Sequence, residues 1–346
     1  MSATKPTIII ISGLLLIAAI ASIIFMNQNN KPATSAESTN ATGAQTAPIP
    51  DEVPRALARA FPTTDWTKRD DAVLEAVSGG PGKDGIPAID EPTFVPLSEY
   101  TRGNDIQAIT MKDGDTVKVY PYNILTWHEI VNDTVDGTPV AITFCPLCGS
   151  AIVFNRTLPN GEVSTFGVSG SLLESNMIMY DRATENLWQQ STGKTLAGSF
   201  HPAELSLESF QLTTMGDVKA QFPDALVLSE DTGYRRDYGR NPYAGYEESD
   251  QFIFAPSAQD SQFPSKTIMA AFKAGDTPVA TPWLKLREAG LATIEIDDIV
   301  YTLDVSDTGE LTITDNAGSE YPFYFEMWFS FAIQHGDTAR IVPLPN

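Results

Sequence analysis

Cysteine, histidine and basic residues are all scarce in this chain of 346 residues. It contains two cysteines, three histidines, and 22 lysine and arginine residues against 44 aspartate and glutamate residues. Two cysteines cannot build a disulfide-dense scaffold, so the domain must fold on its own hydrophobic core. The net charge of −22 argues against nucleic-acid binding through neutralised phosphates. An acidic, solvated surface that keeps the protein soluble explains most of this charge.

Charge is also absent from residues 8–26, IIIISGLLLIAAIASIIFM. This apolar run is long enough to cross a bilayer as a helix, and no clear cleavage site follows it, so we predict a retained signal anchor. With Lys5 in the cytoplasm, residues 1–7 are the cytoplasmic N-terminus and the rest lies outside. Residues 27–50 are small and polar and predict a flexible linker. The prediction is a single-pass cell-membrane protein whose globular domain, residues 51–346, is extracytoplasmic.

Short β-branched and aromatic runs separated by turn residues dominate the globular part. Residues 105–120 predict a hairpin, residues 122–132 a short helix, and residues 210–222 a second helix. The long polar stretch at 232–252 predicts an ordered surface loop. The fold class expected from this pattern is α+β, predominantly antiparallel β, in one globular body.

A weak internal repeat relates two parts of the chain. Ile106 to Leu125 aligns with Ile268 to Leu286, sharing a lysine, Gly-Asp-Thr, a proline and a closing leucine. We therefore predict two β-rich units, residues 106–154 and 268–313, with chance similarity between two hairpins as the alternative. The second range has no cysteine, so any thiol chemistry belongs to the first.

Both cysteines lie in one stretch, VAITFCPLCGSAIVFN, which spans residues 140–155. Two strand-like flanks around Cys-Pro-Leu-Cys-Gly predict a hairpin turn of the knuckle type, in which glycine lets the chain double back. A second Cys-x-x-Cys is absent, which excludes a closed four-cysteine site. Three interpretations remain: a metal site completed by other residues, a reversible dithiol, and a structural hairpin. A strand after the motif disfavours a thioredoxin-like site, where a helix follows.

Other side chains could complete a metal site with Cys145 and Cys148. His128 is the first candidate ligand, with Glu129 and Asn132 as partners that could orient it. Further candidates are two thioethers on one strand face and a carboxylate, namely Met177, Met179 and Asp181. Soft sulfur ligands suit copper, whereas two cysteines and a histidine suit zinc. We expect copper or zinc binding and no nucleotide cofactor, with a thiol oxidoreductase, a Cys2His zinc hydrolase or a structural envelope module as alternatives.

Five blocks of the sequence stand out in order, among them GTPVAITFCPLCGSAIVFNR and DTGYRRDYGRNPY. Together they resemble the domain-of-unknown-function family 3179 (DUF3179) of bacteria and archaea. The resemblance extends from about Lys83 to about Arg340. It implies little about activity, although members of the family often carry an N-terminal signal or anchor. Any partner would be an envelope protein. The five blocks are WHEIVNDT, GTPVAITFCPLCGSAIVFNR, FGVSGSLLESNMIMYDRATENLWQQ, DTGYRRDYGRNPY and MWFSFAIQHGDT.

Overall fold

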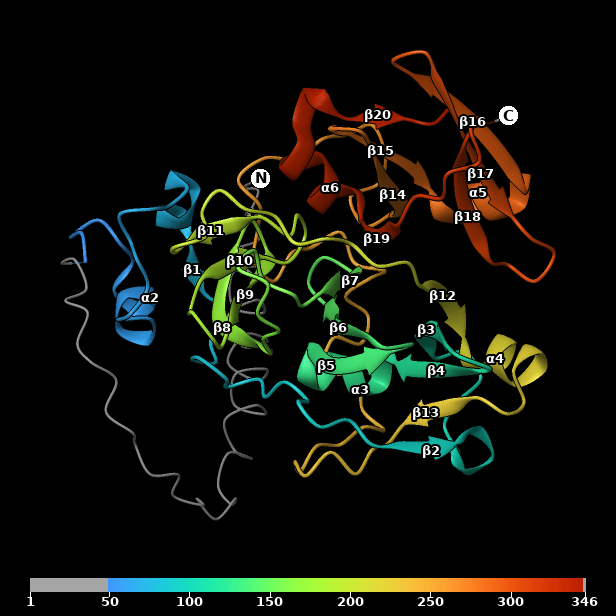
Figure 1. Cartoon of the computed structure of the whole chain (residues 1–346), viewed down its shortest axis with the longest axis horizontal. Coiled ribbons are helices and arrows are strands. Elements are labelled where there is room, and N and C mark those ends of the chain that lie inside the picture. The colour runs from blue at the N-terminus through green and yellow to red at the C-terminus, as the bar shows by residue number, and fades with distance from the viewer. Residues whose placement is uncertain (1–48, 345–346) are drawn as a thin grey trace, which may run out of the picture.

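The computed structural model describes residues 49–344, and antiparallel strands dominate it (Figure 1). Strand pairs are antiparallel apart from β13 with β4 and β20 with β15, which confirms the predicted fold class. The predicted signal anchor and nearly all of the predicted linker lie outside the described residues. Within the described part of the chain, no helix is long and apolar enough to cross a membrane.

The first β-rich unit comprises residues 107–155 and 211–228. Hairpin β3–β4 turns at Gly114, which has a φ of 60°, and Pro121 leads directly into a short helix. Three antiparallel strands follow, and the unit closes with a strand, a helix and a strand. The elements are β3 (Gln107–Asp113), β4 (Thr116–Pro121), α3 (Tyr122–His128), β5 (Ile130–Val135), β6 (Thr138–Cys145), β7 (Ser150–Asn155), β12 (Gln211–Thr214), α4 (Met215–Gln221) and β13 (Leu226–Leu228).

The second unit comprises residues 268–315 and 323–341 and contains the same strands and α-helices in the same order, with one additional 3-10 helix, η3. Its hairpin turns at Gly275, with a φ of 61°, and Pro282 leads into its helix. The elements are β14 (Ile268–Ala274), β15 (Thr277–Pro282), α5 (Trp283–Ala289), β16 (Leu291–Ile296), β17 (Ile299–Val305), β18 (Leu311–Asp315), β19 (Phe323–Met327), α6 (Trp328–His335), η3 (Gly336–Thr338) and β20 (Arg340–Ile341).

Strand pairing in the two units follows the same plan. In the first unit β12 pairs with β3, and β13 lies parallel to β4. In the second unit β19 pairs with β14, and β20 lies parallel to β15. The units differ in their surroundings, because β5–β6–β7 joins a seven-stranded sheet with β14, β15, β19 and β20, whereas β16–β17–β18 is a sheet of its own. Figure 1 shows the second unit at the upper right and the first below it.

Residues 156–210, called the insert here, separate β7 from β12 in the first unit only. In the second unit the equivalent strands are joined by residues 316–322. The insert forms most of a separate five-stranded sheet with β1, at the left of Figure 1. Its strands and the N-terminal elements are β8 (Phe166–Leu173), β9 (Asn176–Asp181), β10 (Leu187–Gln189), β11 (Thr195–Ala197), α2 (Arg55–Ala60), η1 (Asp71–Glu75), β1 (Val77–Ser78), β2 (Phe94–Pro96) and η2 (Leu97–Glu99).

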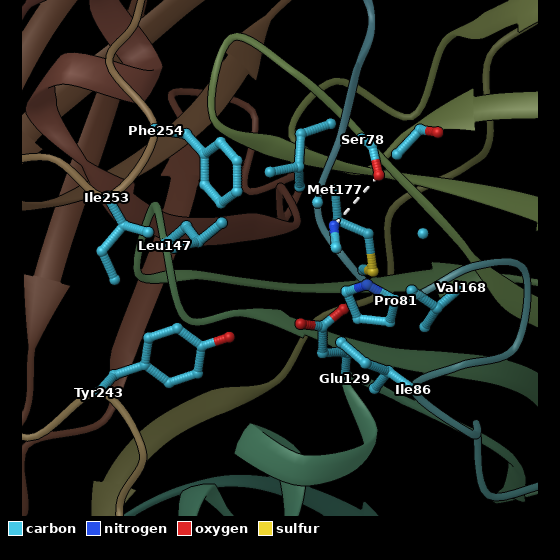
Figure 2. Close-up of a pocket in the computed structure, with 15 residues that line it drawn as sticks. Ser78, Pro81, Ile86, Glu129, Leu147, Val168, Met177, Tyr243, Ile253 and Phe254 are labelled. Atoms are coloured by element: carbon cyan, nitrogen blue, oxygen red, sulfur yellow. Dashed lines mark hydrogen bonds between the residues drawn. The ribbon is translucent and has the colours of Figure 1, made fainter. Parts of the chain in front are cut away.

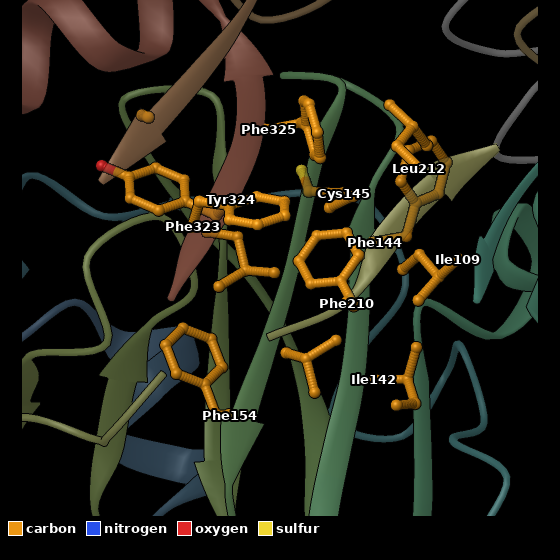
Figure 3. Close-up of a cluster of buried hydrophobic side chains, with 14 of the residues drawn as sticks. Ile109, Ile142, Phe144, Cys145, Phe154, Phe210, Leu212, Phe323, Tyr324 and Phe325 are labelled. Atoms are coloured by element: carbon orange, nitrogen blue, oxygen red, sulfur yellow. The ribbon is translucent and has the colours of Figure 1, made fainter. Parts of the chain in front are cut away.

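The main hydrophobic core runs continuously between the two units. Strand β19 of the second unit pairs with β7 of the first, with Phe325 opposite Ala151. Phe325 is fully buried and packs edge-to-face against Phe210, with 5.8 Å between ring centroids. Figure 3 shows Cys145 beside this aromatic cluster. Burial of large apolar side chains therefore holds the cysteine hairpin at the junction of the units.

The predicted helix at residues 210–222 was placed too early in the chain. Gln211–Thr214 instead form β12, which completes the hydrogen-bonding ladder along β3. The helix begins after Thr214, where a capping box with Asp217 satisfies the free N–H groups of the first turn. Pairing along a sheet edge thus overrides helix formation in the first residues of this stretch.

Candidate functional site

The two cysteines lie on the turn between β6 and β7. Cys145 ends β6, and Gly149 adopts a φ of 55° that reverses the chain before Ser150. A Cβ atom at Gly149 would stand 3.1 Å from side-chain atoms of Met327, so a larger residue there would force the Met327 side chain to shift. The N–H of Met327 donates to the carbonyl oxygen of Cys148 at 2.9 Å. This bond ties the turn to the second unit.

The sulfur of Cys148 is surrounded by polar groups although the side chain has no solvent exposure. The Nδ2 of Asn176 donates to Cys148 Sγ at 3.1 Å, and the Oγ of Ser150 lies 3.2 Å from it. Cys145 is also buried, and its Sγ lies 3.9 Å from the carbonyl oxygen of Ser175. Both thiols are free.

Gln190, the residue directly after the insert's β10, fixes the orientation of these partners. Its Oε1 accepts hydrogen bonds from Ser150 Oγ at 2.5 Å and from Asn176 Nδ2 at 2.8 Å. Its Nε2 donates to Thr143 Oγ1 at 2.9 Å. Because Gln190 is fully buried, every one of these bonds forms away from water and is costly to break. The network links the insert to the cysteine hairpin.

The polar environment separates the acidities of the two thiols. Burial opposes ionisation of Cys148, but hydrogen bonds from Cys145, Ser150 and Asn176 outweigh it and lower the pKa of Cys148 to about 7. Burial raises the pKa of Cys145 well above its ordinary value, and the neighbouring Cys148 adds to the rise. Cys148 is therefore the thiol that ionises first.

Two buried carboxyl groups stand close enough to interact with Cys148. Burial raises the pKa of Glu129 to about 8, and charge on Cys148 raises it further. Burial also raises the pKa of Glu326 well above its ordinary value. Neither carboxyl oxygen of Glu326 has a hydrogen-bond partner among the described residues. Near neutral pH both carboxyl groups are mainly protonated, which leaves Cys148 as the group that carries the negative charge.

A largely apolar cavity of about 180 Å³ opens beside the cysteine turn. Leu147, between the two cysteines, lines it together with Met177. Figure 2 shows the Glu129 carboxyl and the Tyr243 hydroxyl directed into the same space. Glu129 is in the left-handed conformation with a φ of 58°, a strained state for a residue with a side chain.

A second, more polar cavity of about 550 Å³ lies across the turn. Phe144 and Pro146, the residues on either side of Cys145, both line it, as does Tyr243. The first cavity contacts Leu147 and the second contacts Pro146, so the cysteine turn separates them. The thiols themselves line neither cavity.

Residues 229–267, called the connecting segment here, join the units and cover this turn without forming a helix or strand. Tyr246 Oη donates to the carbonyl oxygen of Leu147 at 2.9 Å. Lys266 Nζ donates to the carbonyl oxygens of Tyr246, Ser249 and Gln251, which folds the segment back on itself. The long polar stretch is thus ordered over the site.

The structure places the predicted ligand His128 in another hydrogen-bond network. Its Nδ1 lies 2.7 Å from the carbonyl oxygen of Pro87, and its Nε2 lies 2.7 Å from Tyr238 Oη. Both ring nitrogens are therefore engaged, and neither is directed to a thiol. Within residues 49–344, no three histidine, cysteine, aspartate or glutamate side chains are grouped to hold a metal ion.

The remaining predicted residues have diverse surroundings. Asp181 accepts from Thr184 at one oxygen and from Trp188 Nε1 at the other, while Met177 lines the apolar cavity and Met179 is buried in the main core. Asn132 bridges Phe166 and Asp90 rather than His128. Among the predicted residues other than the cysteines, Glu129 is the one whose pKa the charge on Cys148 shifts.

Sequence reasoning missed Asn176, Gln190 and Glu326. Asn176 is the first residue of β9 and Gln190 directly follows β10, both in the block SNMIMYDRATENLWQQ. Only the packing of the insert shows which residues of this block meet the thiol. No pattern in the sequence around Glu326 predicts its place near Cys148, because that place depends on strand pairing between the two units.

Fold and site together define a β-rich protein with a buried dithiol turn. Residues 83–326 match the family described as protein of unknown function (DUF3179), and the chain belongs to this family. This confirms the family resemblance, with four of the five sequence blocks inside the matched residues. The comparisons found no match to a curated protein and none to a solved structure.

Proposed function

We propose that Cys145 and Cys148 form a redox-active dithiol that exchanges with the disulfide of a substrate. The observation that carries the proposal is the set of hydrogen bonds to Cys148 Sγ, which favours its thiolate inside a buried site. An inert structural thiol in an apolar core has no such partners and has a raised pKa. The engagement of both His128 nitrogens also favours the dithiol over a three-ligand metal site.

The exchange has two balanced steps. The Cys148 thiolate attacks one sulfur of the substrate disulfide, that bond breaks, and the leaving sulfur takes up a proton. Cys145 then loses its proton and attacks the Cys148 sulfur, which closes the Cys145–Cys148 disulfide and releases the second substrate thiol. The substrate gains the two electrons and two protons that the cysteines lose. Access requires displacement of Pro146 or Leu147, since these residues stand between the thiols and the two cavities.

Copper(I) binding is the second candidate function. The pair supplies two adjacent soft ligands on one turn, with the low pKa of Cys148 favouring the deprotonated form that a metal requires. Two thiolates without a third ligand suit copper(I) better than zinc, which takes four ligands.

In either case the site lies outside the cytoplasm behind the anchor at residues 8–26, so full-length protein should pellet with membranes.

Redox titration of the purified full-length protein tests the proposal. Equilibration with reduced and oxidised glutathione should convert two titratable thiols into one disulfide reversibly, with metal analysis showing no bound ion. Asn176→Ala should raise the pKa of Cys148 and move its alkylation profile, normally centred near pH 7, toward higher pH. Failure to form the disulfide under any glutathione ratio would refute the redox proposal. Stoichiometric copper that is lost in a Cys145→Ser, Cys148→Ser variant would establish the second candidate instead.

A further inference from the structure

The apolar cavity beside the cysteine turn contains an unexplained carboxyl group. Glu129 is 7% exposed, and its carboxyl has no hydrogen-bond partner among the described residues, although it is directed into the cavity (Figure 2). The carboxyl oxygens are not fully enclosed by protein, so the cavity is the space that they face. The fold holds Glu129 here in a left-handed conformation, where the equivalent position in the second unit is Gly290. A ligand that pairs with the carboxyl would account for the strained backbone at this position.

The cavity walls indicate what kind of molecule fits. Five separate segments enclose it, and most of the side chains are apolar, including Leu147, Ile253 and Phe254. The Tyr243 hydroxyl, which donates no hydrogen bond to a described residue, points toward Glu129 across the same space. A protonated carboxyl and a phenol are both donors, so the cavity offers two donors and an apolar wall. A carbonyl oxygen has two lone pairs and can accept from both.

Charge decides between a neutral ligand and a cation. An ammonium ligand would require Glu129 to ionise, so two charges would have to leave water together. A neutral acceptor needs no buried charge, because burial already keeps Glu129 protonated up to about pH 8. The neutral form of the carboxyl therefore suits an uncharged ligand.

We propose that this cavity is a binding site for a small, uncharged organic molecule with an apolar body and a carbonyl oxygen, held by hydrogen bonds from Glu129 and Tyr243. The inference goes beyond the dithiol proposal, since no cysteine lines the cavity. It depends on the Glu129 carboxyl and on the apolar walls, whatever the oxidation state of the thiols.

Ligand-observed NMR titration of the full-length protein with three probes tests the inference. The probes are cyclohexanone, cyclohexane and cyclohexylammonium, which share one ring and differ in the acceptor and the charge. Cyclohexanone should bind more tightly than cyclohexane by about tenfold, the effect of one or two buried hydrogen bonds. Its affinity should decline as pH rises past about 8, where Glu129 ionises.

Matched variants in the same preparation separate this site from non-specific partitioning. Glu129→Gly should abolish the preference for the ketone while keeping the backbone conformation that Gly290 adopts in the second unit. Tyr243→Phe should reduce it by about threefold, through loss of one neutral hydrogen bond. Glu288→Gln, at an exposed carboxyl of α5 in the second unit and outside the cavity lining, should leave it unchanged. Equal ketone affinity in wild type and Glu129→Gly would overturn the inference, as would cyclohexylammonium binding that exceeds ketone binding and increases with pH.

Discussion

The two units share one succession of elements, yet only the first carries the cysteine site. Glu129 and Gly290 end equivalent helices, and each carbonyl oxygen accepts an equivalent backbone bond, from Phe144 and Val305 respectively. In the first unit, Cys145 ends the strand before the next turn and Cys148 lies in that turn. In the second unit the equivalent turn, residues 306–310, has no cysteine and is mostly exposed. The site thus arises where one copy departs from a common plan.

The insert makes the largest difference between the units. It brings Asn176 and Gln190 onto the cysteine turn, and the connecting segment adds Tyr246 above Leu147. The second unit has residues 316–322 in place of the insert, and Ser306 at its turn bonds locally with Thr308 and Glu310. Burial by itself opposes ionisation of Cys148, and the hydrogen bond that the insert adds through Asn176 joins those of Cys145 and Ser150 in lowering its pKa.

The largest expected effect comes from breaking the link between the insert and the first unit. Gln190→Ala removes bonds to Ser150, Asn176 and Thr143, all of them buried. Leaving several buried polar groups unsatisfied should lower the free energy of unfolding by about 3 kcal/mol. Urea denaturation of wild type and variant measures this difference.

A control for Gln190→Ala exists in the second unit. Asp304 occupies the position equivalent to Thr143 but is exposed, so Asp304→Ala should change stability by less than about 0.5 kcal/mol. Similar losses in the two variants would contradict the claim that the insert stabilises the first unit selectively.

His128 lies at the position that Ala289 has in the second unit. We expect it to make the folding stability of the protein depend on pH in the acidic range. Burial lowers its pKa to about 4, below the ordinary value of 6.5. The unfolded chain therefore binds a proton between those values while the folded chain does not, so stability falls as pH decreases from 6.5 to 4. His128→Gln should flatten this slope in thermal melts recorded across that range.

His335 has a pKa that burial likewise lowers to about 4, so it contributes a slope of the same sign from the second unit. A His335→Gln variant therefore measures how much of the pH dependence of stability comes from His335 and how much is left for His128. If His128→Gln leaves the wild-type slope intact, the neutral buried state of His128 is refuted.

The sequence predicted the strand-rich fold, the hairpin around the cysteines and the short helix before them, because turn residues and periodicity are local signals. It also aligned Gly275 with Gly114, since both hairpins require glycine at a positive φ. The helix at residues 210–222 was misplaced because strand pairing with β3 is a long-range effect. Local sequence patterns thus predicted which helices and strands are present better than the residues at which they begin and end.

The site was predicted less completely than the fold. Cys145 and Cys148 were evident from their spacing, and Glu129 was named, although as a partner of His128 rather than as a cavity residue. Asn176 and Gln190 reach Cys148 from a different sheet, and no local pattern encodes that contact. The metal prediction remains untested, while His128 shows that proximity along the chain does not place a side chain beside a thiol.

The smallest expected effect compares Glu129 with Gly290 directly. At pH 4.5 and below, where Glu129 is protonated in the folded and the unfolded chain alike, Glu129→Gly should stabilise the protein by about 1 kcal/mol, because glycine adopts a positive φ without the steric cost of a side chain. The gain should increase from pH 4.5 to about 8, where the folded chain keeps a proton on Glu129 that the unfolded chain has lost. Gly290→Ala should destabilise the protein by about 1 kcal/mol, because alanine disfavours the φ of 73° at this position. Open space surrounds the Cβ position, so no steric clash adds to this backbone cost. Chemical denaturation of both variants at pH 5 and pH 8 measures the two effects. A destabilised Glu129→Gly protein would mean that the carboxyl makes a stabilising contact in the folded state, and the comparison between the two helix ends would then lose its basis.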